Sequence, residues 1–190
     1  MTVTTEFAET RLITGEELLA MGDIGPCELV DGRIVPMVPT GGEHGLLESE
    51  VIGHLRDFVI RHRLGWVLGG EVGIYTRRNP DRVRGADVIF VSKERLPELP
   101  QGYLEVPPDL VVEILSPGDR WPDVQQKVEE YFSIGVQQVW IIEPKERTVW
   151  VYSSPTEVQR LGEGDTLRGK GLLEGFALPL AKLFAPRDLL

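Results

Sequence analysis

The sequence predicts a mixed α/β fold, in which helices flank a mixed β-sheet. Residues 107–144 give the first reason, because they read as a buried strand, a turn, an amphipathic helix and a second buried strand. Such a strand–helix–strand unit is expected to be parallel and right-handed. The order of the other patterns gives the second reason: a hairpin and a long helix precede this unit, and short alternating strands follow it.

Length and composition indicate one domain over residues 1–190. A hydrophobic content of 42% and a charged content of 26% are ordinary for a globular protein. No apolar run approaches the roughly 20 residues of a membrane span, and the polar N-terminus lacks a signal-peptide core, so we expect a cytoplasmic protein without membrane contact. The single cysteine, Cys27, excludes an internal disulfide and a cysteine zinc cluster.

The formal net charge of −10 argues against non-specific affinity for nucleic acid unless a local basic patch exists. Two groups of arginines are candidates for phosphate binding, one in a predicted loop and one on a predicted helix: Arg77, Arg78, Arg82 and Arg84, and Arg56, Arg61 and Arg63.

The chain begins with a predicted irregular arm at residues 1–12. A short helix follows the capping-box pattern Thr14-Gly15-Glu16-Glu17. Asp31-Gly32 then joins two alternating runs, CELV and RIVPMV, which predicts a hairpin with a type I′ turn. Pro36 and Pro39 indicate that the second strand of this hairpin lies at a sheet edge.

The middle of the chain predicts one long helix at residues 43–64, with a broad apolar face. Two short strands are expected on either side of Gly69-Gly70, followed by a polar loop at residues 77–85. An apolar strand at residues 86–91 carries Asp87 near its start. At the other end of the chain, short antiparallel strands at residues 148–152 and 157–161 and a helical turn at residues 181–184 are expected.

The buried strand at residues 111–115 carries Glu113 in its middle. A buried carboxylate needs a partner, because desolvating its charge costs several kcal/mol or more. On the helix predicted for residues 121–134, Lys127 projects about 40° beyond the apolar face, so its long stem can bring an ammonium to the strand. Asp123, one turn earlier, offers the alternative of holding Lys127 at the surface.

Asp87 and Glu113 are acids embedded in apolar strands, and on adjacent strands they can share a hard divalent cation such as magnesium. Such an ion offsets the cost of burial, polarises a phosphoryl oxygen and lowers the pKa of a bound water. Lys127 would orient or deprotonate that water, or neutralise the developing charge. The structural alternative is a salt bridge between Lys127 and one carboxylate, or acids that face solvent at the strand ends.

Three histidines share the long helix, but His44, His54 and His62 do not form an i, i+4 metal pair. Ordinary, partly exposed side chains are the simplest interpretation. His44 alone stays a candidate, because it lies at the helix start.

Several segments together resemble the Uma-two family, small bacterial proteins assigned as restriction endonucleases within the PD-(D/E)XK nuclease superfamily. They are ELVDG at 28–32, His44, ADV at 86–88, VVEILSP at 111–117, and Asp119-Arg120 followed by Lys127 and Tyr131. The resemblance implies a restriction-endonuclease-like core at about residues 28–152, with the N-terminal hairpin and the C-terminal antiparallel strands as additions. It also matches Asp87 and Glu113 to the two acids of the superfamily motif.

Two positions depart from that motif. Ala86 replaces a proline that contributes no ligand, and Leu115 replaces the motif lysine. The resemblance therefore implies a lysine relocated to the following helix, which selects Lys127. It further implies that Glu28 and His44 line the site, against the structural alternatives of a hairpin charge pair and a helix-end hydrogen bond.

These expectations lead to one hypothesis: an endonuclease that uses Mg²⁺ or Mn²⁺ to hydrolyse DNA phosphodiester bonds. Asp87 and Glu113 would hold the metal, and Lys127 would act on the attacking water. Members of such superfamilies often work as dimers, so a homodimer is a further expectation. The first rival, favoured by Leu115 and the acidic charge, is a binding module for nucleic acid or protein that has lost catalysis. The second rival is a metal-free enzyme with paired acids, such as a glycosidase.

Overall fold

The computed structural model describes residues 11–185, so residues 1–10 of the predicted arm lie outside the described range. In chain order the elements are α1 (Gly15–Ala20), β1 (Cys27–Val30), β2 (Arg33–Pro36), α2 (Gly42–His62), β3 (Gly65–Arg77), β4 (Arg82–Ser92), β5 (Leu110–Ile114), α3 (Trp121–Ile134), β6 (Gln138–Glu143), β7 (Thr148–Tyr152), β8 (Val158–Leu161), β9 (Thr166–Arg168), the short 3₁₀ helix η1 (Gly171–Leu173), β10 (Ala177–Pro179) and α4 (Leu180–Phe184).

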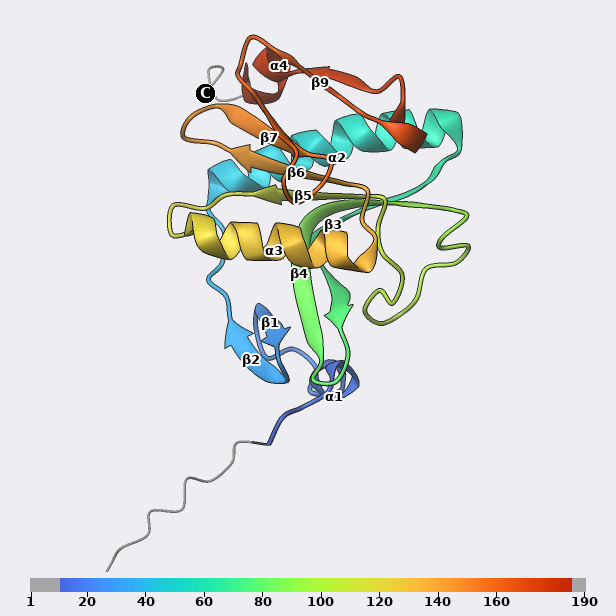
Figure 1. Cartoon of the computed structure of the whole chain (residues 1–190), viewed down its shortest axis with the longest axis vertical. Coiled ribbons are helices and arrows are strands. Elements are labelled where there is room, and N and C mark those ends of the chain that lie inside the picture. The colour runs from blue at the N-terminus through green and yellow to red at the C-terminus, as the bar shows by residue number, and fades with distance from the viewer. Residues whose placement is uncertain (1–10, 186–190) are drawn as a thin grey trace, which may run out of the picture.

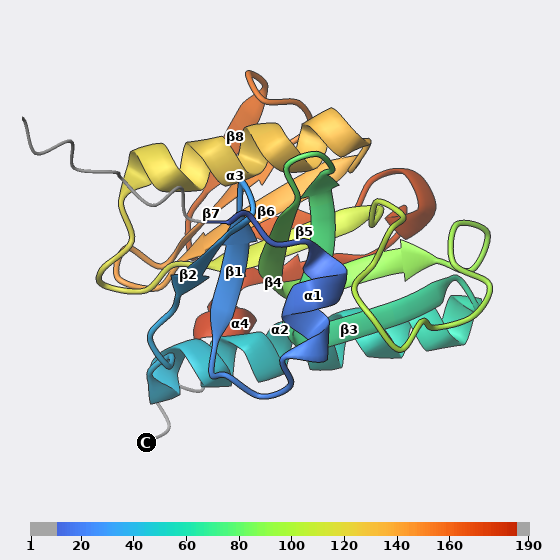
Figure 2. The same cartoon turned by 90° about the horizontal axis from the view of Figure 1, so that it is seen from below.

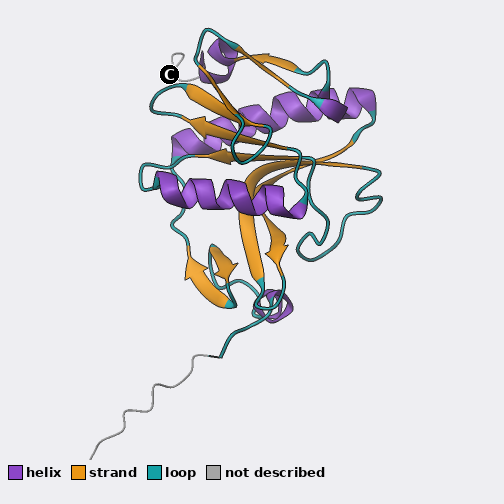
Figure 3. Ribbon diagram, in the orientation of Figure 1, coloured by secondary structure: helices purple, strands orange, loops and turns teal. Residues whose placement is uncertain are grey.

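A mixed eight-stranded sheet lies at the centre of the fold. Its strands follow the order β2-β1-β4-β5-β6-β7-β8, and β3 pairs with β4. Helix α3 covers one face and α2 the other, so the molecule has three layers (Figures 1 and 2). The C-terminal β9–β10 pair and α4 lie beyond α2 (Figure 3). The predicted class, a mixed sheet flanked by helices, is confirmed.

The N-terminal hairpin forms as predicted. Strands β1 and β2 pair antiparallel, with Val30 opposite Arg33. Asp31 and Gly32 both have positive φ, 53° and 72°, as a type I′ turn requires. Strand β2 lies at the edge of the sheet, where Pro36 removes no needed donor.

Strands β3 and β4 differ from the prediction in two ways. The expected pair of short strands is one long strand, β3, whose ladder continues past a register shift between Gly69 and Val72. The expected polar loop at residues 77–85 is mostly strand, because β4 begins at Arg82 rather than at Ala86. The arginines that made this segment look like a loop are tolerated in the sheet because carboxylates pair with them.

The β5–α3–β6 unit is parallel, as expected, with Val111 opposite Val139. Pro122 occupies the first turn of α3, and Gly135 ends the helix with a φ of 102°. Side chains alternate along β5, so Val112 packs in the core against α2 while Val111 packs in the core against α3. This alternation points Glu113 toward α3.

The C-terminal strands β7 and β8 extend the sheet antiparallel, and α4 supplies the expected helical turn. Among the described residues, no helix is long and apolar enough to cross a membrane.

Candidate functional site

Asp87 and Glu113 lie side by side on neighbouring strands. Val88 pairs with Val112 in the β4–β5 ladder, which puts Asp87 across from Glu113. The backbone N–H of Ile114 donates to Oδ2 of Asp87 over 2.6 Å and holds this carboxylate at the end of β5. Both acids line a cavity of about 420 Å³, in keeping with the expectation that they lie close together on adjacent strands.

Two donors from α3 hold the Glu113 carboxylate. The hydroxyl of Tyr131 donates to Oε1, and Nζ of Lys127 lies 3.4 Å from Oε2. Burial raises the pKa of Glu113 to about 7 even though Lys127 opposes the shift, and Asp87 adds to the rise. A second cation beside this carboxylate would favour its charged form.

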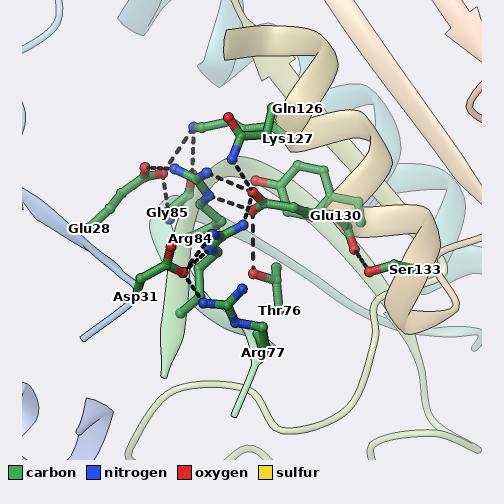
Figure 4. Close-up of polar contacts among 12 residues, drawn as sticks. Glu28, Asp31, Thr76, Arg77, Arg84, Gly85, Gln126, Lys127, Glu130 and Ser133 are labelled. Carbon is green, nitrogen blue, oxygen red and sulfur yellow. Dashed lines mark hydrogen bonds and ion pairs between the residues drawn. The ribbon is translucent and has the colours of Figure 1, made fainter. Parts of the chain in front are cut away.

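Lys127 reaches the site from α3, as the helical spacing predicted. Its Nζ lies 3.0 Å from Oε1 of Glu28 and 3.4 Å from the carbonyl oxygen of Gly85 (Figure 4). Asp123 does not hold Lys127 at the surface, because it pairs with Arg120 instead. Burial opposes the charge on Lys127, but Glu113 and Glu28 outweigh it and raise its pKa above the usual range. Lys127 is therefore a fixed ammonium, suited to stabilising negative charge rather than to accepting a proton.

Glu28 joins Lys127 to a buried ion-pair network. Its Oε2 accepts from Nη1 of Arg84 over 2.7 Å, and its Oε1 accepts from the backbone N–H of Gly85 over 3.1 Å. Arg84 in turn donates to both oxygens of Glu130 on α3, over 2.7 and 2.9 Å (Figure 4). The hairpin, β4 and α3 thus fix the position of the lysine together.

The loop arginines do not form the free basic patch considered for phosphate binding. Arg84 pairs with Glu28 and Glu130, and the other three have acidic partners: Arg77 with Asp31; Arg78 with Glu16, Asp81 and Glu105; Arg82 with Asp31 and Glu130. On α2, Arg61 pairs with Asp57. Internal carboxylates therefore pair with the four loop arginines, whereas Arg56 and Arg63 of the second group are exposed.

His44 lies at the start of α2 and faces Asp87, with Nε2 3.2 Å from Oδ2. Burial opposes its protonation, but the hydrogen bond and charge of Asp87 raise its pKa above the ordinary value. Its Nδ1 is buried and has no hydrogen-bond partner in the described chain. His54 lies near Glu50, and His62 contacts the carbonyl of Phe58, so neither joins the site.

Sequence reasoning missed two functional candidates. Tyr131 was named as part of the family resemblance and was given no role in the site, although its hydroxyl contacts Glu113. Its spacing of one turn after Lys127 was the available signal. Glu71 also lines the cavity, and it comes from the bulge of β3 that was interpreted as a glycine turn.

The donor set fits a hard divalent cation. Within residues 11–185, no three His, Cys, Asp or Glu side chains converge closely enough to enclose a metal ion. Asp87 and Glu113 would therefore be the only side-chain ligands, which suits Mg²⁺, an ion that keeps several waters. No donor in the described chain contacts Oδ1 of Asp87, so this oxygen is left for a ligand.

The fold of this chain is similar to that of a solved structure entitled a putative nuclease belonging to DUF820, from Anabaena variabilis ATCC 29413. The two chains share 23% identity, the match covers 91% of this chain and 98% of that one, and the TM-score is 0.77. At this identity the match shows the fold alone, and it agrees with the predicted mixed α/β sheet flanked by helices.

The chain belongs to the Uma2 family, described as "Putative restriction endonuclease", whose profile matches residues 16–181. The sequence resemblance to the Uma-two family is therefore confirmed, and nucleic acid is the substrate class that the family implies. No curated protein matches this chain.

Proposed function

We propose that this protein is a divalent-metal-dependent endonuclease that hydrolyses DNA phosphodiester bonds, with Mg²⁺ or Mn²⁺ as the ion. The observation that carries the proposal is the convergence of Asp87, Glu113 and the ammonium of Lys127 on one cavity. Both carboxylates are buried, and of the two only Glu113 pairs with Lys127, so a cation from solution would offset the remaining cost of burial.

Asp87 and Glu113 would hold the ion, which supplies polarisation of a phosphoryl oxygen and a lower pKa for a bound water. In the reaction, a water oxygen forms a bond to phosphorus and the bond from phosphorus to one sugar oxygen breaks. Lys127, fixed by Glu28 and Glu113, stabilises the negative charge that develops on the phosphoryl oxygens.

The same geometry supports metal dependence of substrate binding as well as of cleavage. The protein carries a formal net charge of −10, and the arginines nearest the site are paired with carboxylates. A phosphate entering the cavity would therefore meet Lys127 and the bound ion as its counter-charges. We expect DNA affinity to fall strongly when the metal is chelated.

The proposal is tested by incubating the protein with supercoiled, linear and single-stranded DNA and Mg²⁺ or Mn²⁺. The Asp87→Asn and Glu113→Gln variants should lose cleavage, while Glu157→Gln, an exposed acid on the loop before β8, should retain it. Cleavage that persists in both site variants would come from a contaminant and would refute the assignment.

Two controls separate the rivals. A binding module that has lost catalysis would bind DNA without cleaving it and would show no Mn²⁺ binding that depends on Asp87 in calorimetry. A metal-free glycosidase would keep its activity in a chelator. The homodimer and the cytoplasmic location stay predictions, and sedimentation of the purified protein tests the first.

A further inference from the structure

The cavity holds a further carboxylate, Glu71, from the bulge of β3. The register of the β3–β4 ladder shifts between Gly69 and Val72, and Glu71 has a φ of 61° within this interval. A side chain other than glycine is unfavourable in that left-handed conformation. The fold therefore keeps a glutamate where local energetics favour a glycine, and the bulge directs this glutamate toward Asp87 and Lys127.

A glycine on the neighbouring strand makes room for Glu71. A Cβ atom at position 85 would lie only 3.1 Å from Oε2 of Glu71. The backbone of Gly85 also contacts the site directly, because its N–H donates to Glu28 and its carbonyl accepts from Lys127. The Glu71 carboxylate thus lies next to Gly85 of β4, whose backbone contacts both Glu28 and Lys127.

The proton acceptor for the attacking water can be found by comparing the groups that line the cavity. Lys127 is an ammonium held between two acids. His44 directs Nε2 at Asp87, and its other nitrogen is buried away from solvent. Glu113 accepts from both Tyr131 and Lys127. None of these groups has a free basic atom for a water in the cavity.

Glu71 differs from them, because no side chain or backbone donor in the described residues contacts its carboxylate. It is also an exposed residue, so it can exchange a proton with bulk solvent. It does not close a three-residue metal cage with Asp87 and Glu113. It is therefore a free carboxylate beside the expected metal ligands.

We propose that Glu71 is the general base that accepts a proton from the attacking water, an inference that rests on the proposed nuclease function. One O–H bond of the water breaks as its oxygen bonds to phosphorus, and the proton passes to the Glu71 carboxylate. The bond from phosphorus to the leaving sugar oxygen breaks, and that oxygen takes a proton from solvent. Glu71 then releases its proton to solvent through its exposed side.

The surrounding charges suit this role. The ionisable groups that act on Glu71 are Asp87 on β4, Lys127 on α3, Glu28 on β1 and His44 on α2. Desolvation raises the pKa of Glu71 above its ordinary value, and the Asp87 carboxylate adds to this rise. A more basic carboxylate is a better proton acceptor near neutral pH.

The test compares Glu71→Gln, Glu71→Asp and Glu71→Ala with Glu98→Gln, an exposed acid outside the cavity lining. The readouts are cleavage rate as a function of pH and Mn²⁺ affinity by calorimetry. We expect Glu71→Gln to lower the cleavage rate about 10²–10⁴-fold, the usual contribution of a general base. At saturating Mn²⁺, which keeps Glu113 ionised, the acidic limb of its pH–rate profile should disappear, and Mn²⁺ affinity should stay within about threefold. Glu71→Asp should keep part of the activity, and added formate should partly restore Glu71→Ala.

Each contrary result has a distinct meaning. If Glu71→Gln cleaves DNA at the wild-type rate and with the wild-type pH profile, Glu71 is not the general base, although the proposed nuclease function still holds. A parallel loss of Mn²⁺ binding and cleavage would make Glu71 a metal ligand and also refute it. If Glu71→Ala is inactive and is not rescued by formate, and the acidic limb of the pH–rate profile is unchanged in Glu71→Gln, then Glu71 has only a structural role. A wild-type protein that neither cleaves DNA nor binds Mn²⁺ would refute the proposed function itself, and this inference with it.

Discussion

Lys127 of α3 and Glu28 of the N-terminal hairpin form an ion pair, with 3.0 Å between Nζ and Oε1. The hairpin, an addition to the expected core, therefore completes a site whose acids lie on the central strands β4 and β5. Glu28 also binds Arg84, so the lysine is held by a network rather than by one contact (Figure 4).

The first prediction concerns this pair. Glu28→Gln keeps the shape of the side chain but removes the charge that orients Lys127. We expect cleavage to fall about 10–100-fold, as is typical when a supporting contact of a metal site is lost. Mn²⁺ affinity, measured by calorimetry, should change far less. A cleavage rate equal to that of the Glu157→Gln control would show that Glu28 does not position the lysine.

The second prediction concerns the charge of Lys127. Lys127→Met preserves the stem but removes the ammonium, and one lost stabilising donor lowers kcat by about 10²–10³. Because Lys127 lowers the pKa of Glu113, Mn²⁺ binding to the variant should need a higher pH than in the wild type, and once Glu113 is ionised it should be at least as tight, because a competing cation is gone. Lys93→Met, on an exposed position, is the matched control. Loss of Mn²⁺ binding in the Lys127 variant would mean that the lysine only maintains the fold.

The third prediction follows from Glu130 on α3. Burial opposes its ionisation, but Arg84 and Arg82 outweigh this effect and lower the pKa of Glu130 below 4.5. Because the folded pKa is lower than the unfolded one, the stabilisation is full above about pH 4.5 and is lost as the pH falls further. At pH 7, Glu130→Gln should cost about 3 kcal/mol. This corresponds to a Tm lower by about 6–12 °C.

The matched control for Glu130 is its exposed neighbour Glu129, changed to glutamine. Thermal unfolding from pH 7 to pH 3 should show the wild-type and Glu130→Gln curves converging below pH 4.5. A constant gap across this range would contradict an ionic origin for the stabilisation.

The fourth prediction separates the function of Glu71 from its backbone strain. With a φ of 61°, this residue carries a cost of about 1 kcal/mol that glycine relieves. Glu71→Gly should therefore have a Tm about 2–4 °C above that of Glu71→Ala while both lose cleavage. Equal melting temperatures would show that the bulge is not strained.

The elements that sequence predicted well are those set by local chemistry. Asp31-Gly32 specified the hairpin turn, and Pro122 and Gly135 marked the ends of α3. Lys127 was placed correctly because helical spacing alone limits where its side chain can point. The position of Glu113 within an apolar strand correctly predicted a cation beside it, because a buried charge needs a partner.

The parts that sequence missed depend on contacts between distant segments. Arg82 and Arg84 looked like loop residues because their partner, Glu130, lies on another element. Gly69-Gly70 resembled a turn, whereas the ladder of β3 continues past it and presents Glu71 to the cavity. No local pattern indicates that a bulge will direct a particular side chain at a site.

The central claim, that Asp87 and Glu113 hold a divalent cation, is tested most directly by the anomalous scattering of a crystal soaked in Mn²⁺. The account predicts one strong peak about 2.2 Å from an oxygen of each carboxylate, and no such peak in Asp87→Asn crystals. A well-diffracting soaked crystal with no peak between these two residues, or with its peak elsewhere in the molecule, would contradict it.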